Sequence, residues 1–205
     1  MKKILFKIIF VFILLIFSVF NCYSQNQFQK DSIATTTIAK DFFNWYITSA
    51  KENKSGYQPE FIEDDNGMTT LDYSNYIENL IKHSFSDSLI AKEKHSYSEC
   101  IKNLAKLKYS DFLKFENLDD FESRDCDFSN YYRWIGGQEM SSGYSVTKIK
   151  SDKGKLIVIG FLFGNPENND KRSFVKDVSV TFIKQKDKWK ILIFGIEPPA
   201  PLYNH

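Results

Sequence analysis

The fold class is decided by one stretch near the C-terminus, residues 174–196, which read FVKDVSVTFIKQKDKWKILIFGI. Apolar and polar side chains alternate along Phe174–Lys184, the period of a β-strand with one buried face. Residues 186–188 supply a turn, and Trp189–Ile196 returns as a second strand. The stretch therefore predicts an antiparallel hairpin.

Two more strands are expected just upstream. Residues Tyr144–Lys150 alternate in the same way, and residues 151–154 form a turn that ends in glycine. Leu156–Phe163 is an apolar run of strand length, rich in β-branched and aromatic residues. Three prolines after residue 197 end the last strand, because proline has no N–H to donate to a neighbouring strand. The second half of the chain thus reads as a four-stranded meander.

The first half has the helical period instead. From Thr35 onward, apolar and aromatic residues recur every three or four positions as far as Ser49. Residues 72–82 and 86–104 each begin at a capping Asp or Ser and carry further apolar stripes. Residues 111–127 are aromatic and acidic without a clear period, and we expect an irregular connection there. Helices followed by an antiparallel meander predict an α+β fold with helices packed on a curved sheet.

These patterns also predict which residues form the core. The helical stripe and the inward-facing strand positions should be buried together, namely Phe42, Trp45, Tyr46, Leu104, Val180, Phe182, Trp189 and Ile191.

The N-terminus has the order of a secretory signal peptide. Two lysines follow Met1, residues 8–17 are an unbroken apolar run, and Cys22-Tyr23-Ser24 places small residues before a cut at Gln25. A membrane anchor is the alternative, but the apolar run is shorter than the roughly 20 residues of a spanning helix. Lipidation at Cys22 is a third possibility, although Phe20 and Asn21 fit that cleavage site poorly. We expect export to the periplasm or the extracellular space.

The expected organisation is therefore a signal peptide at 1–24, a polar leader at 25–34, one α+β domain at 35–197, and a C-terminal tail at 198–205. The mature chain has two more acidic than basic residues, because three lysines leave with the signal peptide. A near-neutral balance gives no general attraction to nucleic acid, so nucleic acid is not an expected partner. No transmembrane segment is expected in the mature chain.

Two cysteines remain after cleavage, Cys100 and Cys126. An oxidising compartment permits a disulfide between them, which would tie the irregular connection to a helix. Two separately buried thiols are the alternative, since free cysteine packs as a small hydrophobe.

The chain resembles a known superfamily in its packing motifs. The helical core Phe42-Phe43-Asn44-Trp45-Tyr46 and the closing hairpin with its Asp187-Lys188-Trp189-Lys190-Ile191 are similar to the cystatin-like cone of the nuclear transport factor 2-like superfamily, over about residues 35–197. Within it, the chain most resembles secreted bacterial proteins of unknown function. The resemblance implies a possible pocket and no particular reaction, because the superfamily includes enzymes as well as proteins that only bind.

Residue patterns typical of catalysis or metal binding are largely missing. The three histidines of the chain, His83, His95 and His205, lack the spacing of a zinc site, and no glycine-rich phosphate loop is present. The acidic run 63–67 lacks the first and last ligands of a calcium loop, so a solvated turn is expected. We therefore expect no cofactor, no metal and no assigned catalytic residue.

The best candidate for a binding site is the transition from helices to sheet. Its members are Tyr132, Arg133, Trp134, Gln138 and Glu139. An arginine among aromatic rings suits a carboxylate or a stacked ring. The alternative is that the aromatic residues fill the core, Gly136 and Gly137 form a turn, and Arg133 pairs locally.

Three classes of function follow. The first is a non-catalytic exported module that binds a ligand or partner. The second is a small enzyme with a carboxylate general base in the pocket of the cone. The third is an immunity-type or envelope protein that binds another protein. The lack of a catalytic pattern favours the first and the third.

Overall fold

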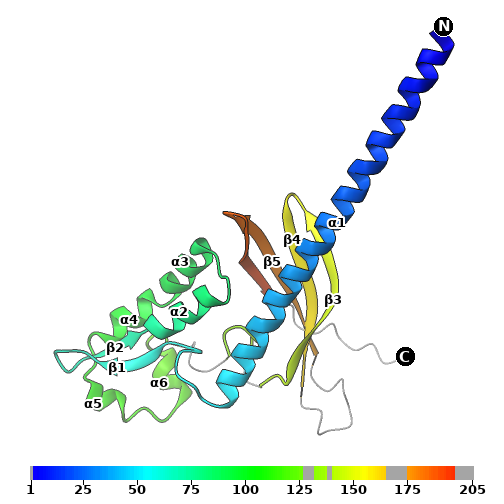
Figure 1. The fold of residues 1–205 in the computed structure, drawn as a ribbon. Coiled ribbons are helices and arrows are strands. Elements are labelled where there is room, and N and C mark those ends of the chain that lie inside the picture. The colour runs from blue at the N-terminus through cyan, green and yellow to red at the C-terminus, as the bar shows by residue number, and fades with distance from the viewer. Residues whose placement is uncertain (1, 127–131, 138–139, 165–174, 197–205) are drawn as a thin grey trace.

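The structure, a computed structural model, describes residues 2–126, 132–137, 140–164 and 175–196, with side chains from Gln25 onward except those of Leu118 and Val175. One long helix comes first, and a short hairpin, five short helices and four strands follow it (Figure 1). The elements are α1 (Lys2–Lys51), β1 (Glu60–Glu63), β2 (Thr69–Asp72), α2 (Ser74–Lys82), α3 (Asp87–Ser96), α4 (Ser98–Leu104), α5 (Tyr109–Phe112), α6 (Leu118–Glu122), β3 (Gly143–Asp152), β4 (Lys155–Phe163), β5 (Val175–Gln185) and β6 (Lys188–Ile196).

The four C-terminal strands form one antiparallel sheet in the order β3-β4-β5-β6. The α+β class and the four strands read from the sequence are thereby confirmed. Both hairpin turns have positive φ angles at their two central residues, Lys153 and Gly154 in one and Lys186 and Asp187 in the other. Such turns match the right-handed twist of the flanking strands.

Helix α1 begins far earlier than the apolar stripe at Thr35 indicates. The residues expected to form a polar leader, 25–34, are helical. Within this range Ser32 is buried, and the Asp31 carboxylate accepts a 2.8 Å hydrogen bond from the Trp189 indole of β6. The face of this part of α1 that packs against the protein is therefore polar, and a pattern of apolar residues does not reveal it.

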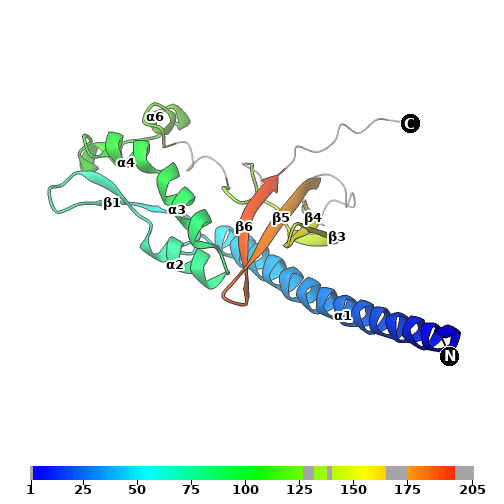
Figure 2. The same ribbon diagram turned by 90° about the horizontal axis from the view of Figure 1, so that it is seen from above.

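The core lies where α1 crosses one face of the sheet, and a second group of helices covers the β6 side (Figures 1 and 2). Aromatic rings dominate it. The Phe42 ring lies 5.0 Å from that of Phe85 and 5.2 Å from that of Phe194, measured between centroids. The rings of Phe43 and Tyr144 are 4.3 Å apart. The space between the helices and the sheet is therefore filled with side chains.

Six of the eight residues expected in the core are buried: Phe42, Tyr46, Leu104, Val180, Phe182 and Ile191. The two tryptophans are only partly buried, which corrects the expectation for them. Trp45 stacks on His83 at the rim, with ring centroids 4.5 Å apart. Trp189 stays at the edge because its indole N–H donates to Asp31 on α1.

A disulfide joins Cys100 of α4 to Cys126, with the Sγ atoms 2.05 Å apart and the Cα atoms 4.9 Å apart. It spans 26 positions of sequence, and closing a loop of this size contributes about 3 kcal/mol in the chain-entropy model. The sequence predicted an irregular connection over residues 111–127. This prediction is wrong in part, because α5 ends and α6 lies within that range.

No helix among the described residues combines the length and the apolar character needed to cross a bilayer.

The different burial of Phe42 and Trp189 predicts different costs of truncation. Phe42→Ala should lower the free energy of unfolding by about 3–5 kcal/mol, as truncation of a buried aromatic does. Trp189→Ala should lower it by only about 2 kcal/mol, because part of the ring stays in solvent in the wild type. Urea unfolding of the two oxidised variants measures both values. A cost for Trp189→Ala equal to or above that for Phe42→Ala would contradict this packing.

Candidate functional site

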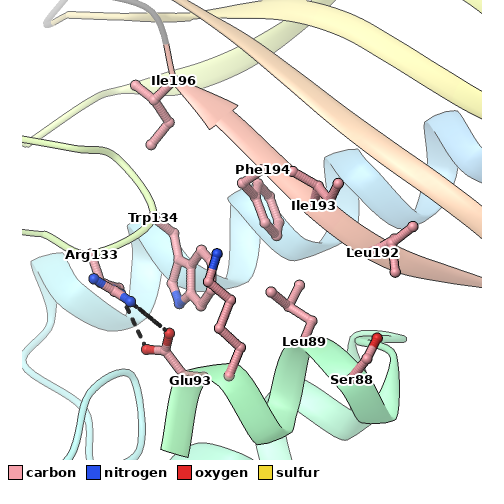
Figure 3. A pocket seen from close by; sticks show the side chains of 10 residues that line it. Ser88, Leu89, Glu93, Arg133, Trp134, Leu192, Ile193, Phe194 and Ile196 are labelled. Carbon is pink, nitrogen blue, oxygen red and sulfur yellow. Dashed lines mark hydrogen bonds and ion pairs between the residues drawn. The ribbon is translucent and has the colours of Figure 1, made fainter. Parts of the chain in front are cut away.

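A cleft of about 370 Å³ lies between helix α3 and strand β6 (Figure 3). Most of its wall is apolar, and four polar side chains stand along the helix side. The lining residues are Ser88, Leu89, Lys92, Glu93, Arg133, Trp134, Leu192, Ile193, Phe194 and Ile196.

The start of α3 fixes one end of the cleft. Ser86 caps the helix, its hydroxyl accepting from the Leu89 N–H at 3.3 Å. The backbone on either side of Phe85 pairs with β6: the Ser86 N–H donates to the Ile191 carbonyl at 2.9 Å, and the Ile191 N–H donates to Ser84 at 2.7 Å. Beyond Ile191, β6 runs away from α3, which opens the cleft (Figure 3).

Glu93 is the polar centre of this region. It sits on α3 with only 2 % of its surface exposed. The Arg133 guanidinium reaches it from the segment before the sheet, with Nη2 3.0 Å and Nε 3.2 Å from Oε2. A buried carboxylate requires such a partner, because moving its charge out of water costs several kcal/mol of free energy. Attraction to a counter-charge and hydrogen bonds to the carboxylate offset a cost of about this size.

Two tyrosines complete the coordination of this carboxylate. The hydroxyls of Tyr76 and Tyr97 both donate to Glu93 Oε1, at 2.8 Å and 2.5 Å. Burial, followed by the nearby negative charge, raises the pKa of both phenols far above the ordinary value of 10. The phenols therefore remain protonated and act as donors.

The floor of the cleft is tied to the same group. The Trp134 indole N–H donates to the Tyr76 hydroxyl at 2.9 Å. Its ring is 5 % exposed and lies 4.8 Å from that of Phe194 and 5.0 Å from that of Phe85. The Phe42 ring lies 6.0 Å away as well, so one hydrogen bond and three ring contacts hold the indole in the floor of the cleft.

Lys92 gives the mouth of the cleft its positive charge. It is exposed, and within the described part of the chain no carboxylate lies within ion-pair distance of its ammonium group. Because Arg133 and Glu93 neutralise each other, Lys92 leaves the described residues that line the cleft with a net charge of +1. An anionic group on a ligand would be favoured there.

Of the five residues predicted to form the site, two line the cleft, one does not, and two lie outside the described residues. Arg133 and Trp134 line the cleft, although Trp134 is also part of the core and Arg133 pairs with a residue forty positions away. Tyr132 closes a turn with Gly137, its N–H donating to the Gly137 carbonyl at 2.8 Å, and it does not line the cleft. Gln138 and Glu139 lie outside the described residues.

The residues that sequence reasoning missed come from α3 and β6. Glu93 had a detectable signal, because it falls three residues after Ile90 and four before Tyr97 on the buried stripe of its helix. A carboxylate on an apolar stripe indicates a buried partner. The contribution of Leu192–Ile196 had no such signal, since the strand pattern alone does not show which element covers an edge strand.

The acidic run 63–67 and carboxylates of the acidic stretch 111–127 have structural roles. In the acidic run 63–67, Glu63 ends β1 and the other residues lie in the turn of the β1–β2 hairpin. There the Asp64 carboxylate accepts from the N–H groups of Asn66 and Met68. These backbone hydrogen bonds hold the pKa of Asp64 below its ordinary value. Asp120 accepts from the Asn117 N–H at the start of α6, and Asp125 accepts from the Asn103 side chain. Across the described residues no cluster of His, Cys, Asp and Glu side chains could hold a metal ion.

Comparison of the chain with models of protein families, with curated proteins and with solved structures gives no match.

The network predicts strong coupling between Glu93 and Arg133. Arg133→Met should lower the free energy of unfolding by about 2–4 kcal/mol, because it leaves a buried carboxylate without its counter-charge. The double variant with Glu93→Gln should lose less than the sum of the single variants, with a coupling of about 1–3 kcal/mol. Urea unfolding of the four proteins gives this value.

The exposed pair Glu78 and Lys82 is the matched control, and its coupling should be about 0.5 kcal/mol or less. If Glu93 and Arg133 were as weakly coupled as this pair, the ion pair would not organise the site.

Proposed function

We propose that this chain is an exported bacterial protein that binds, without catalysis, a small apolar ligand bearing a carboxylate in the cleft between α3 and β6. The observation that carries the proposal is the cleft itself. Its volume of about 370 Å³ lies within the range of small-molecule pockets. Apolar walls with a few convergent polar groups are the usual composition of such sites.

The charges at the cleft define the class of ligand. An apolar body would pack on Leu89, Trp134 and Phe194, and a carboxylate would reach Lys92 at the mouth. A cationic or fully polar ligand would lose its hydration there without a matching partner. Medium-chain fatty acids and aromatic carboxylates have the required chemistry.

The state of Glu93 favours binding over catalysis. A general base needs a free lone pair within reach of the proton that it removes. The Glu93 carboxylate already accepts hydrogen bonds from Tyr76, Tyr97 and Arg133. This pairing disfavours the alternative of a small enzyme with a carboxylate base.

The proposal includes a cystatin-like cone of the nuclear transport factor 2-like type. Supporting features are the long helix across a four-stranded antiparallel sheet and the helices that precede the sheet in sequence. In such a cone the interior would be filled by aromatic rings, and the ligand would lie at the edge beside β6.

Export is supported by two features. The N-terminal order of basic, apolar and small residues is that of a signal peptide, with Gln25 as the first mature residue. The disulfide between Cys100 and Cys126 suits an oxidising compartment. A lipid-anchored form at Cys22 is the alternative product of the same segment.

Ligand titration tests the binding proposal. Decanoate and an aromatic carboxylate should change the fluorescence of Trp134, measured in a variant in which Trp45 and Trp189 are replaced by Phe. Lys92→Gln should weaken binding of the carboxylates about tenfold, the value of one charge-assisted hydrogen bond. Ile193→Asp should abolish binding, because it places a negative charge on the wall of the cleft.

Lys94→Gln on the same helix is the control, since Lys94 does not line the cleft, and it should bind as the wild type does. Trp134 fluorescence that no carboxylate changes, or equal affinities for Lys92→Gln and Lys94→Gln, would show that the proposal is wrong.

A further inference from the structure

Eight of the nine lysines on the described strands and turns of the sheet lie toward one end of it, and Lys176 lies toward the other. Because β3 and β4, and likewise β5 and β6, are joined by two-residue turns, both turns lie at the same end of the antiparallel sheet. Eight lysines on these two hairpins form what we call the basic pole: Lys148, Lys150, Lys153, Lys155, Lys184, Lys186, Lys188 and Lys190. All of them are at least partly exposed.

The net charge of the basic pole differs strongly from the net charge of the whole chain, which is +1. Within residues 148–155 and 184–190 the eight lysines are accompanied by Asp152 and Asp187, and Asp31 of α1 pairs with Lys184 at 3.3 Å, which leaves a net charge of +5. Residues 52–126, which hold the hairpin β1–β2 and the helices α2–α6, carry sixteen acidic and nine basic residues, a net charge of −7. A chain that is nearly neutral overall is thus divided into a basic end and an acidic helical layer. Such an asymmetry indicates an anionic partner at the basic end.

The N-terminal part of α1 leaves the molecule on the same side. Figure 1 shows the helix projecting past the two hairpin ends, away from the helical layer. A chain that is inserted through its N-terminal segment, or anchored at Cys22, would therefore face the membrane with the basic pole. The geometry favours a lipid surface over a soluble polyanion, because it places the charges where the membrane-directed segment emerges.

A groove with aromatic side chains lies within the basic pole. It has a volume of about 530 Å³ between the middle of α1, at residues 27–31, and the two hairpins. Phe28, which is 44 % exposed, and Trp189 line it together with Lys155 and Lys184. Asp31 also lines it, where its carboxylate pairs with Lys184 and accepts from the Trp189 indole, so among the described residues of the groove Lys155 is the lysine that carries the free charge. Aromatic and basic side chains side by side are typical of the interface between a membrane and water.

We propose that the basic pole is a docking surface for an anionic lipid bilayer. The lysines of both hairpins would lie against acidic headgroups, and Phe28 and Trp189 would lie at the level of the headgroups. The inference rests on export, which is one part of the proposed function, and it does not depend on the cleft. Each lysine held at an anionic surface strengthens binding by a factor of about five.

Vesicle sedimentation with the exported, processed protein tests this surface. The α1 backbone before Gln25 stands clear of the rest of the chain in Figures 1 and 2, so its removal leaves the core intact. The intact mass of the purified protein first shows whether the chain begins at Gln25 or at a lipidated Cys22. If the chain is not exported and processed, its intact mass is that of the full-length chain. If the docking surface is wrong, the processed protein does not sediment with the anionic vesicles.

The wild type should bind vesicles of equal parts phosphatidylglycerol and phosphatidylcholine, and it should not bind phosphatidylcholine alone. Binding should be lost in about 1 M NaCl, where the screening length falls to about 3 Å. A variant with Lys150, Lys153, Lys186 and Lys188 all changed to Gln should bind at least about 100-fold more weakly.

The matched control changes four lysines of the helical layer to Gln: Lys54, Lys82, Lys102 and Lys114. It loses the same total charge, and the exposed ion pairs that it removes contribute little to stability. Its binding should stay within about threefold of the wild type, since these lysines lie away from the membrane. Equal loss in both variants, equal binding to phosphatidylcholine, or tighter binding to single-stranded DNA than to vesicles would each overturn the proposal.

Discussion

The ion pair between Glu93 and Arg133 is the interaction on which the candidate site depends. It joins α3 to the segment that leads into the sheet, forty residues later. Tyr76 brings α2 to the same carboxylate, and Trp134 reaches it through the Tyr76 hydroxyl. A carboxylate that is 2 % exposed cannot lose these donors without a large cost, so the elements that supply them have little freedom to shift. The cleft is therefore formed before any ligand arrives.

Much of the architecture follows from periodicity in the sequence. The four strands and the α+β class were predicted correctly, because alternating residues and turn signals are local and strong between residues 144 and 196. The start of α1 was misplaced, because the residues before Thr35 that face the protein are polar, such as Asp31 and Ser32, and form no apolar stripe. The edge positions of Trp45 and Trp189 were also missed. Each ring has a specific partner, His83 or Asp31, that no pattern of hydrophobicity shows.

Only part of the candidate site could be predicted from the sequence, for a related reason. Arg133 and Trp134 stood out through their composition, and both line the cleft. The other wall comes from α3 and β6, which meet through long-range pairing of the backbone around Phe85 with Ile191. Such contacts depend on tertiary packing, and sequence spacing does not encode them. The position of Glu93 between Ile90 and Tyr97 was the one local sign of a buried polar centre.

Strand β6 connects the two proposed surfaces. It begins at Lys188 in the basic pole and ends at Ile196 in the wall of the cleft. A protein docked on a bilayer through the first would keep the second open to ligand. The central claim is that the cleft binds a carboxylate ligand while Glu93 and Arg133 stay paired. A crystal structure of the processed protein with decanoate tests it most directly. The account predicts the alkyl chain against Trp134 and Phe194, the carboxylate at Lys92, and an unbroken pair of Glu93 and Arg133. An empty cleft, or a decanoate that displaces Glu93 from Arg133, would contradict it.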